Sequence, residues 1–78
     1  MRTRTPHFVV TFHTTAEAMA TERLCRSLNL PGRLIPVPRA VTSDCGIAWS
    51  APPEAAEEIR AALREAGVET AGDYELLL

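Results

Sequence analysis

The chain has no lysine, so all eight of its basic side chains are arginine. These arginines are scattered along 78 residues, apart from Arg2 and Arg4 near the start, and the formal net charge is −2. Proteins that bind nucleic acid normally concentrate basic side chains in a patch that faces the phosphates. The composition therefore argues against a nucleic-acid partner.

Long apolar runs are also missing. No segment approaches the roughly 20 apolar residues that a membrane-spanning helix needs. The opening segment MRTRTPHF lacks the apolar stretch of a signal peptide. We expect no membrane association and a cytoplasmic location. A chain of 78 residues suits a single domain, expected here at 7–78 after a short tail at 1–6.

Cysteine is scarce, since only Cys25 and Cys45 are present. The sequence contains no Cys-x-x-Cys pair and no cysteine–histidine cluster with zinc spacing. In a reducing compartment both cysteines should be free thiols. We therefore expect no structural disulfide, no bound metal and no cofactor.

Two helices are predicted from local signals. Thr14 followed three residues later by Glu17 is typical of a capping box, so the first helix should cover 15–29. The second should cover 53–66 after a pair of prolines, because proline is tolerated in a first helical turn, and Gly67 should end it. Apolar residues recur every four positions in the first helix and predict its buried side: Ala16, Ala20, Leu24 and Leu28.

Four strands are predicted around these helices. The first alternates, with Phe8 and Phe12 on one face and Val9 on the other. Pro36 cannot donate a ladder hydrogen bond, which places the second strand at a sheet edge. The order β-α-β-β-α-β favours an α+β fold, a ferredoxin-like two-layer sandwich whose four-stranded antiparallel sheet has the order 4-1-3-2 and both helices on one face. The strands are expected at 7–13, 33–37, 45–51 and 74–78.

The second sheet face should stay open in such a fold. Val9 and Leu77 are expected on it, and an exposed apolar patch often marks an association surface. The sequence therefore predicts that a homodimer, or docking to a partner protein, covers this face.

The segment PVPRAVTSDCG places a thiol between two predicted strands. In the expected topology the end of the first strand, the start of the first helix and this segment meet at one end of the sheet. The helix N-terminus and Arg39 would favour the reactive thiolate, whereas Asp44 would oppose it unless Arg39 pairs with that carboxylate. The residues expected to cluster are His13, Thr14, Thr15, Arg39, Ser43 and Cys45.

Each of these residues also has a plainer interpretation. Cys45 would serve equally as a small apolar residue at a strand edge, although the loop position favours an exposed thiol that is more reactive than the packed Cys25. Gly46, which has no Cβ, would allow close backbone approach beside the sulfur. Arg39 could be a solvated side chain, and His13 could be a surface histidine or a proton donor to sulfur.

At these residues the chain resembles a small bacterial family of selenium/sulfur carrier protein-like domains. Pro38 and Arg39 match a proline–arginine pair, and Cys45 and Gly46 match a Cys-Gly pair. The segment VVTFHTTAEAMATERL is similar to the family's first strand and helix, so the resemblance runs from about residue 7 to 74. It implies that Cys45 carries sulfur or selenium as a persulfide or perselenide. The partners that it implies are a cysteine desulfurase-type donor and an unknown acceptor protein. Asp44 departs from the small neutral residues usual at that position.

Three functions follow from these observations. The favoured one is a non-enzymatic carrier on Cys45. The second is a ferredoxin-like binding or regulatory module, in which Cys45 only packs or senses redox state. The third is a small thiol transferase, the least supported because His13 alone does not complete a catalytic constellation.

Overall fold

The computed structural model describes residues 3–78, so the first two residues of the predicted tail lie outside it. Four strands and two α-helices follow one another along the chain in the predicted order, β-α-β-β-α-β. Their bounds are β1 (Pro6–Thr11), α1 (Thr15–Ser27), β2 (Arg33–Pro36), β3 (Ile47–Ala51), a 3₁₀ turn η1 (Pro53–Ala55), α2 (Ala56–Ala66) and β4 (Gly72–Leu77).

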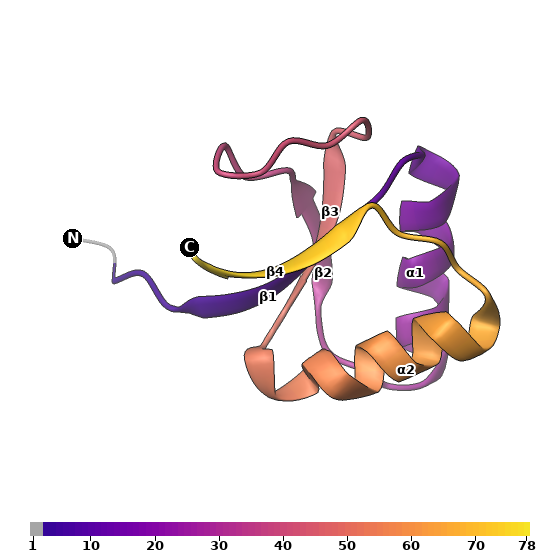
Figure 1. The fold of residues 1–78 in the computed structure, drawn as a ribbon. Coiled ribbons are helices and arrows are strands. Elements are labelled where there is room, and N and C mark those ends of the chain that lie inside the picture. Colours follow the sequence, from indigo (N-terminus) through magenta and orange to yellow (C-terminus); the bar gives the residue numbers. More distant parts are fainter. Residues whose placement is uncertain (1–2) are drawn as a thin grey trace.

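The four strands form one antiparallel sheet in the order β2-β3-β1-β4. This is the predicted 4-1-3-2 order, and it places the proline-containing β2 at an edge, as expected. Figure 1 shows α1 and α2 on the same side of this twisted sheet, with the β2–β3 connection projecting at one end. The ferredoxin-like α+β architecture is confirmed.

The core lies between the sheet and the helices. Phe8 and Val10 pair across the sheet with Ala51 and Trp49, so these four side chains share the face that the helices cover. Trp49 also packs against the backbone of Gly32, whose φ of 138° suits glycine. A Cβ at that position would lie 2.5 Å from the indole nitrogen, so the close approach requires glycine.

The buried side of α1 differs from the prediction. Ala18, Thr21 and Cys25 are buried, whereas Ala16 and Leu28 are exposed. A step of four residues turns an α-helix by about 400°, so a strict four-residue repeat drifts around the helix by about 40° per step. Thr21 is buried without leaving its hydroxyl unsatisfied, because the hydroxyl donates to the carbonyl of Glu17 within the helix.

The open face of the sheet also differs from the prediction. Val9 lies on it, but Val9 is fully buried between its partners Ser50 and Tyr74. Leu77 pairs with Pro6, two residues before Phe8, so it belongs to the helix-covered face. A one-residue difference in register exchanges the two faces. Val9 and Leu77, from which the apolar patch was predicted, therefore do not form a patch together.

Element ends differ slightly from those predicted. The third strand begins at Ile47, which leaves Cys45 and Gly46 in the preceding loop. The prolines before α2 give a 3₁₀ turn in which the N–H of Ala55 donates to the carbonyl of Pro52. Within residues 3–78, neither helix is long and apolar enough to cross a membrane.

Candidate functional site

The loop between β2 and β3, residues 37–46, holds most of the predicted site. Its ends are joined because the N–H of Val37 donates to the carbonyl of Gly46 at 3.1 Å. Inside it, a tight turn forms as the N–H of Val41 donates to the carbonyl of Pro38. Pro38 therefore contributes its backbone carbonyl to the turn, a role that does not depend on its side chain.

Cys45 lies where this loop meets the start of α1. Its Sγ is 3.8 Å from Oγ1 of Thr15, the first residue of that helix. The predicted meeting of Thr15 and Cys45 is therefore observed. The expected exposure is wrong, because the Cys45 side chain is only 5% exposed and belongs to the hydrophobic core cluster. The strand begins two residues later than predicted, and the thiol turns inward below the loop.

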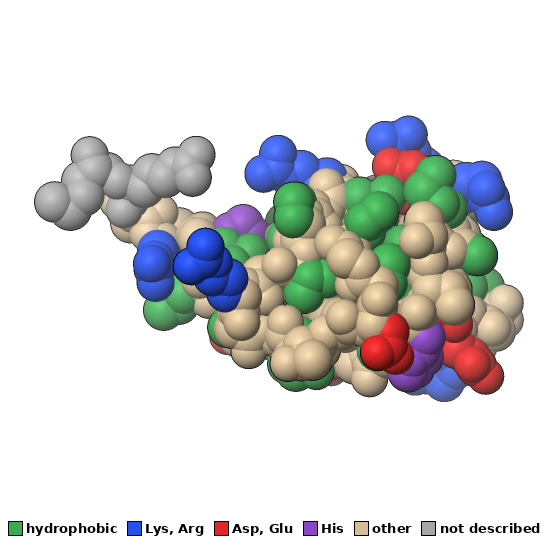
Figure 2. Space-filling model, turned by 90° about the horizontal axis from the view of Figure 1, so that it is seen from above, with side chains coloured by type: hydrophobic (Ala, Val, Ile, Leu, Met, Phe, Trp, Pro, Cys, Tyr) green, Lys and Arg blue, Asp and Glu red, His purple; other side chains and the backbone are tan. Residues whose placement is uncertain are grey.

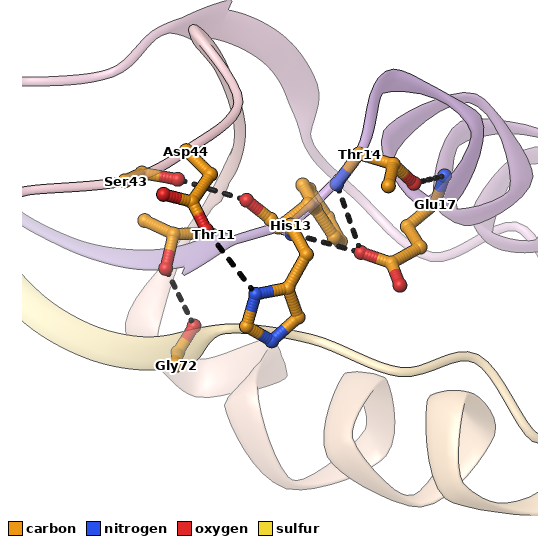
Figure 3. A network of polar contacts seen from close by, with 8 residues as sticks. Thr11, His13, Thr14, Glu17, Ser43, Asp44 and Gly72 are labelled. Atoms are coloured by element: carbon orange, nitrogen blue, oxygen red, sulfur yellow. Dashed lines mark hydrogen bonds and ion pairs between the residues drawn. The ribbon is translucent and has the colours of Figure 1, made fainter.

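The start of α1 carries the predicted capping box. The N–H of Glu17 bonds to the hydroxyl of Thr14, and the Glu17 carboxylate accepts from the N–H groups of Thr14 and His13. Figure 3 shows these bonds beside the loop that precedes β3. The capping box fixes where α1 begins, and thereby holds the first helical turn next to the sulfur.

Two further contacts hold the loop against the end of β1. The Ser43 hydroxyl donates to the carbonyl of Phe12 at 2.9 Å. Nδ1 of His13 lies 3.7 Å from an Asp44 carboxylate oxygen, and both side chains are exposed. Figure 3 shows both contacts reaching across from the loop to the β1–α1 connection. His13, Thr14 and Ser43 thus come together as predicted, and Asp44 joins them through His13.

Arg39 and Gly46 have surroundings that differ from their predicted ones. Arg39 is exposed, and among the described residues no ion pair links it to Asp44, whose partner is His13. A Cβ added at Gly46 would meet nothing within 4 Å, so this glycine is not required for a close approach. Its role in the loop is the carbonyl that accepts from Val37.

Cys25 is a structural thiol. It is fully buried on α1 against the sheet, as its packing role predicted. Burial raises the pKa of the Cys25 thiol, because a thiolate loses hydration in the core. The predicted difference in reactivity between the two cysteines therefore rests on their surroundings. Cys25 lies in the core, whereas Cys45 adjoins a helix N-terminus and a loop.

The sequence did not indicate two of the groups that position the site. The backbone carbonyl of Phe12 accepts the bond from Ser43, although Phe12 was expected only in the core. Glu17 binds the N–H of His13 in addition to the capping-box bonds. Among residues 3–78, no three histidine, cysteine or carboxylate side chains gather in a way that could hold a metal ion.

The chemistry open to this arrangement is that of a thiol beside a helix N-terminus. The first turn of a helix presents backbone N–H groups without intrahelical partners and the positive end of its dipole, both of which favour an anionic sulfur. A persulfide anion or perselenide anion would gain from the same groups.

Comparison with curated proteins and with solved structures finds no match. A family model matches residues 7–75, and the chain therefore belongs to the family described as "putative Se/S carrier protein-like".

Proposed function

We propose that this protein is a sulfur or selenium carrier that holds its cargo on Cys45. The single observation that carries the proposal is the position of Cys45 Sγ, 3.8 Å from the Thr15 hydroxyl at the first turn of α1. Membership of a Se/S carrier-like family supports it. A carrier of this kind works with protein partners, and we infer a desulfurase-type donor and a separate acceptor.

Loading would be a thiol exchange reaction without net oxidation. The Cys45 thiolate attacks the terminal sulfur of a donor cysteine persulfide, forming a new sulfur–sulfur bond. The donor's own sulfur–sulfur bond breaks, and its cysteine leaves as a thiolate. The proton of the donor persulfide stays on the transferred sulfur. Delivery repeats the step, with the acceptor thiolate attacking the terminal sulfur on Cys45. A perselenide cargo follows the same scheme.

The burial of Cys45 sets a condition on this exchange. A donor sulfur must approach Sγ in line with the bond that breaks, and a thiol that is 5% exposed offers little room for that approach. The loop at 37–46 is the part that could move. Besides the Thr15–Cys45 contact, the side-chain contacts at its end in the described residues are the Ser43 bond and the His13–Asp44 pair, and that pair is exposed to water. We infer that loading proceeds through a displaced loop.

The test is intact-mass measurement after incubation with a cysteine desulfurase and cysteine. Wild type should gain about 32 Da, one sulfur atom, and reduction with dithiothreitol should remove it. Cys45→Ser should abolish the gain. Cys25→Ala is the matched control and should load like wild type, because Cys25 lies in the core.

Two outcomes would contradict the proposal. Loading that persists in Cys45→Ser would place the cargo elsewhere. A folded wild type that gains no mass, under conditions that load an established carrier, would favour the binding or regulatory module instead. Selenium loading is measured in the same way with a selenocysteine-derived donor, for a gain of about 79 Da.

A further inference from the structure

A cavity of about 620 Å³ lies on the open face of the sheet, away from the thiol. His7, Ser50 and Arg33 mark it, from β1, β3 and β2 respectively, and they occupy neighbouring register positions near the N-terminal end of β1. Cys45 lies beyond the other end of that strand, near the start of α1. The residues lining this open-face cavity are Thr3, Arg4, His7, Arg33, Ile35, Ser50 and Leu78.

The charged side chains among the described residues that line this cavity are arginines. Arg4 and Arg33 both line it and both are exposed. Among the ion pairs of residues 3–78, neither arginine has a carboxylate partner, and no aspartate or glutamate is among the described lining residues. Figure 2 shows arginine side chains close together near the N-terminal end of the molecule. Guanidinium groups without a partner bind carboxylate and phosphate through paired N–H donors.

A chain of hydroxyl and imidazole groups supplies further polar contacts. Nδ1 of His7 lies 3.2 Å from the Ser50 hydroxyl, and Nε2 of the same ring lies 3.1 Å from the Thr5 hydroxyl. The imidazole is thereby fixed between two hydroxyls. Ser50 is only 7% exposed, so its hydroxyl has a defined position at the base of the cavity. When Nδ1 of His7 carries the ring proton and donates to it, this ordered hydroxyl keeps its own proton and can donate that proton to an anion.

A second cavity of about 600 Å³ adjoins the first and shares His7, Arg33 and Ser50 with it. Its walls include Pro31, Pro52 and Pro53, which offer rigid apolar surface. Glu54 also lines this second cavity and disfavours a negative charge there. Arg33 lines both cavities, so the second cavity has one arginine and one carboxylate, whereas the first has two arginines and, among its described lining residues, no carboxylate side chain. The first cavity therefore suits an anionic group and the second an uncharged one. Cavities of several hundred Å³ are typical of small-molecule sites.

We propose that the open-face cavity binds the oxyanion group, phosphate or carboxylate, of a small molecule through Arg4 and Arg33, with Ser50 at its base. The uncharged part of the ligand lies against the prolines of the adjoining cavity. This site is separate from Cys45 and goes beyond the proposed carrier function. The sheet face that neither helix covers combines two arginines, a hydroxyl in a fixed position and a cavity large enough for a small ligand.

The test is a titration followed by amide chemical shifts of the ¹⁵N-labelled protein at constant ionic strength, which keeps general charge screening unchanged. Inorganic phosphate is the probe in one arm and succinate in the other. We expect saturable shifts centred on the amides of His7, Arg33 and Ser50. Arg33→Ala should weaken binding at least about five-fold, the loss of one charge-assisted hydrogen bond. Arg23→Ala removes an exposed arginine of α1 that has no ion pair within residues 3–78, and it should bind like wild type.

The outcomes separate the sources of the anion. Saturation by phosphate alone assigns a phosphate ligand, saturation by succinate alone assigns a carboxylate, and saturation by both supports a general oxyanion site. Absence of saturable shifts with either probe overturns the proposal, as does equal weakening by Arg33→Ala and Arg23→Ala. Sulfur loading of Cys45, measured on the same variants, reports on the carrier function independently.

Discussion

The two cysteines differ in what surrounds each sulfur atom. Cys25 is enclosed by core side chains and burial raises its pKa, so its thiol stays protonated under ordinary conditions. Cys45 adjoins the hydroxyl of Thr15 and the first turn of a helix. Residue type alone does not distinguish them. The two cysteines are distinguished by their positions relative to the start of α1 and the loop at 37–46.

The raised pKa of Cys25 predicts a loss of stability at alkaline pH. The folded state holds this proton more tightly than the unfolded chain does, so the stabilisation is complete below the ordinary pKa of 9.0. It declines as pH rises above that value toward the folded pKa. We expect the free energy of unfolding in urea to fall as the pH rises above about 9 in wild type, and to fall less in Cys25→Ala.

The control for this experiment is Thr42→Ala, which changes an exposed loop residue, leaves both cysteines in place and should keep the wild-type dependence on pH. The comparison uses the slope of the free energy of unfolding against pH. The cavity that Cys25→Ala leaves in the core lowers this free energy equally at every pH and so does not change the slope. An equal decline in all three proteins would mean that Cys25 titrates alike in the folded and unfolded chains.

We infer that the loop at 37–46 controls access to Cys45. The bond from Ser43 to the Phe12 carbonyl is worth about 1 kcal/mol, which corresponds to about a five-fold change in the population of an opened loop. We expect Ser43→Ala to raise the rate of Cys45 alkylation by iodoacetamide about five-fold, as measured by mass spectrometry. Thr42→Ala changes an exposed neighbour in the same loop and is the matched control.

An unchanged rate in Ser43→Ala would show that reagents reach the sulfur without displacing the end of the loop that Ser43 holds. A similar increase in Thr42→Ala would assign the effect to general loosening of the loop. Either result would argue against the Ser43 bond as the contact that limits loading.

Elements defined by local chemistry could be predicted from the sequence. The Thr14–Glu17 capping box, the edge position of Pro36 and the left-handed end of α2 at Gly67 each depend on a few adjacent residues. The buried side of α1 and the face of Leu77 were predicted wrongly. Both depend on rotation or register, where an error of one residue moves a side chain to the other side.

The candidate site was predictable only in part, for a related reason. Topology brought Cys45 to the start of α1, as expected. The inward turn of its side chain, the partner of Asp44 and the Phe12 carbonyl that binds Ser43 depend on loop conformation. Contacts between segments some 30 residues apart set that conformation, and no local pattern in the loop specifies it.

At the level of the whole molecule, the open sheet face bears on self-association. The sequence predicted from Val9 and Leu77 that a homodimer, or a docked partner protein, covers this face, but Val9 is buried within one chain and Leu77 lies on the other face. The large apolar side chains that remain exposed on the open face are Tyr74 and Leu78. A stable interface usually buries about 800 Å² on each partner around an apolar centre.

The open face also carries Arg4 and Arg33, and a two-fold dimer through this face would place both copies of each arginine in one interface. Like charges without partners oppose that contact, and two exposed apolar side chains offer little to offset it. We therefore expect light scattering at micromolar concentration to give a monomer of 8.5 kDa. A larger species would instead support the homodimer predicted from the sequence. Tyr74→Asp would then decide whether this face is used, because a carboxylate at a buried apolar contact should dissociate the dimer.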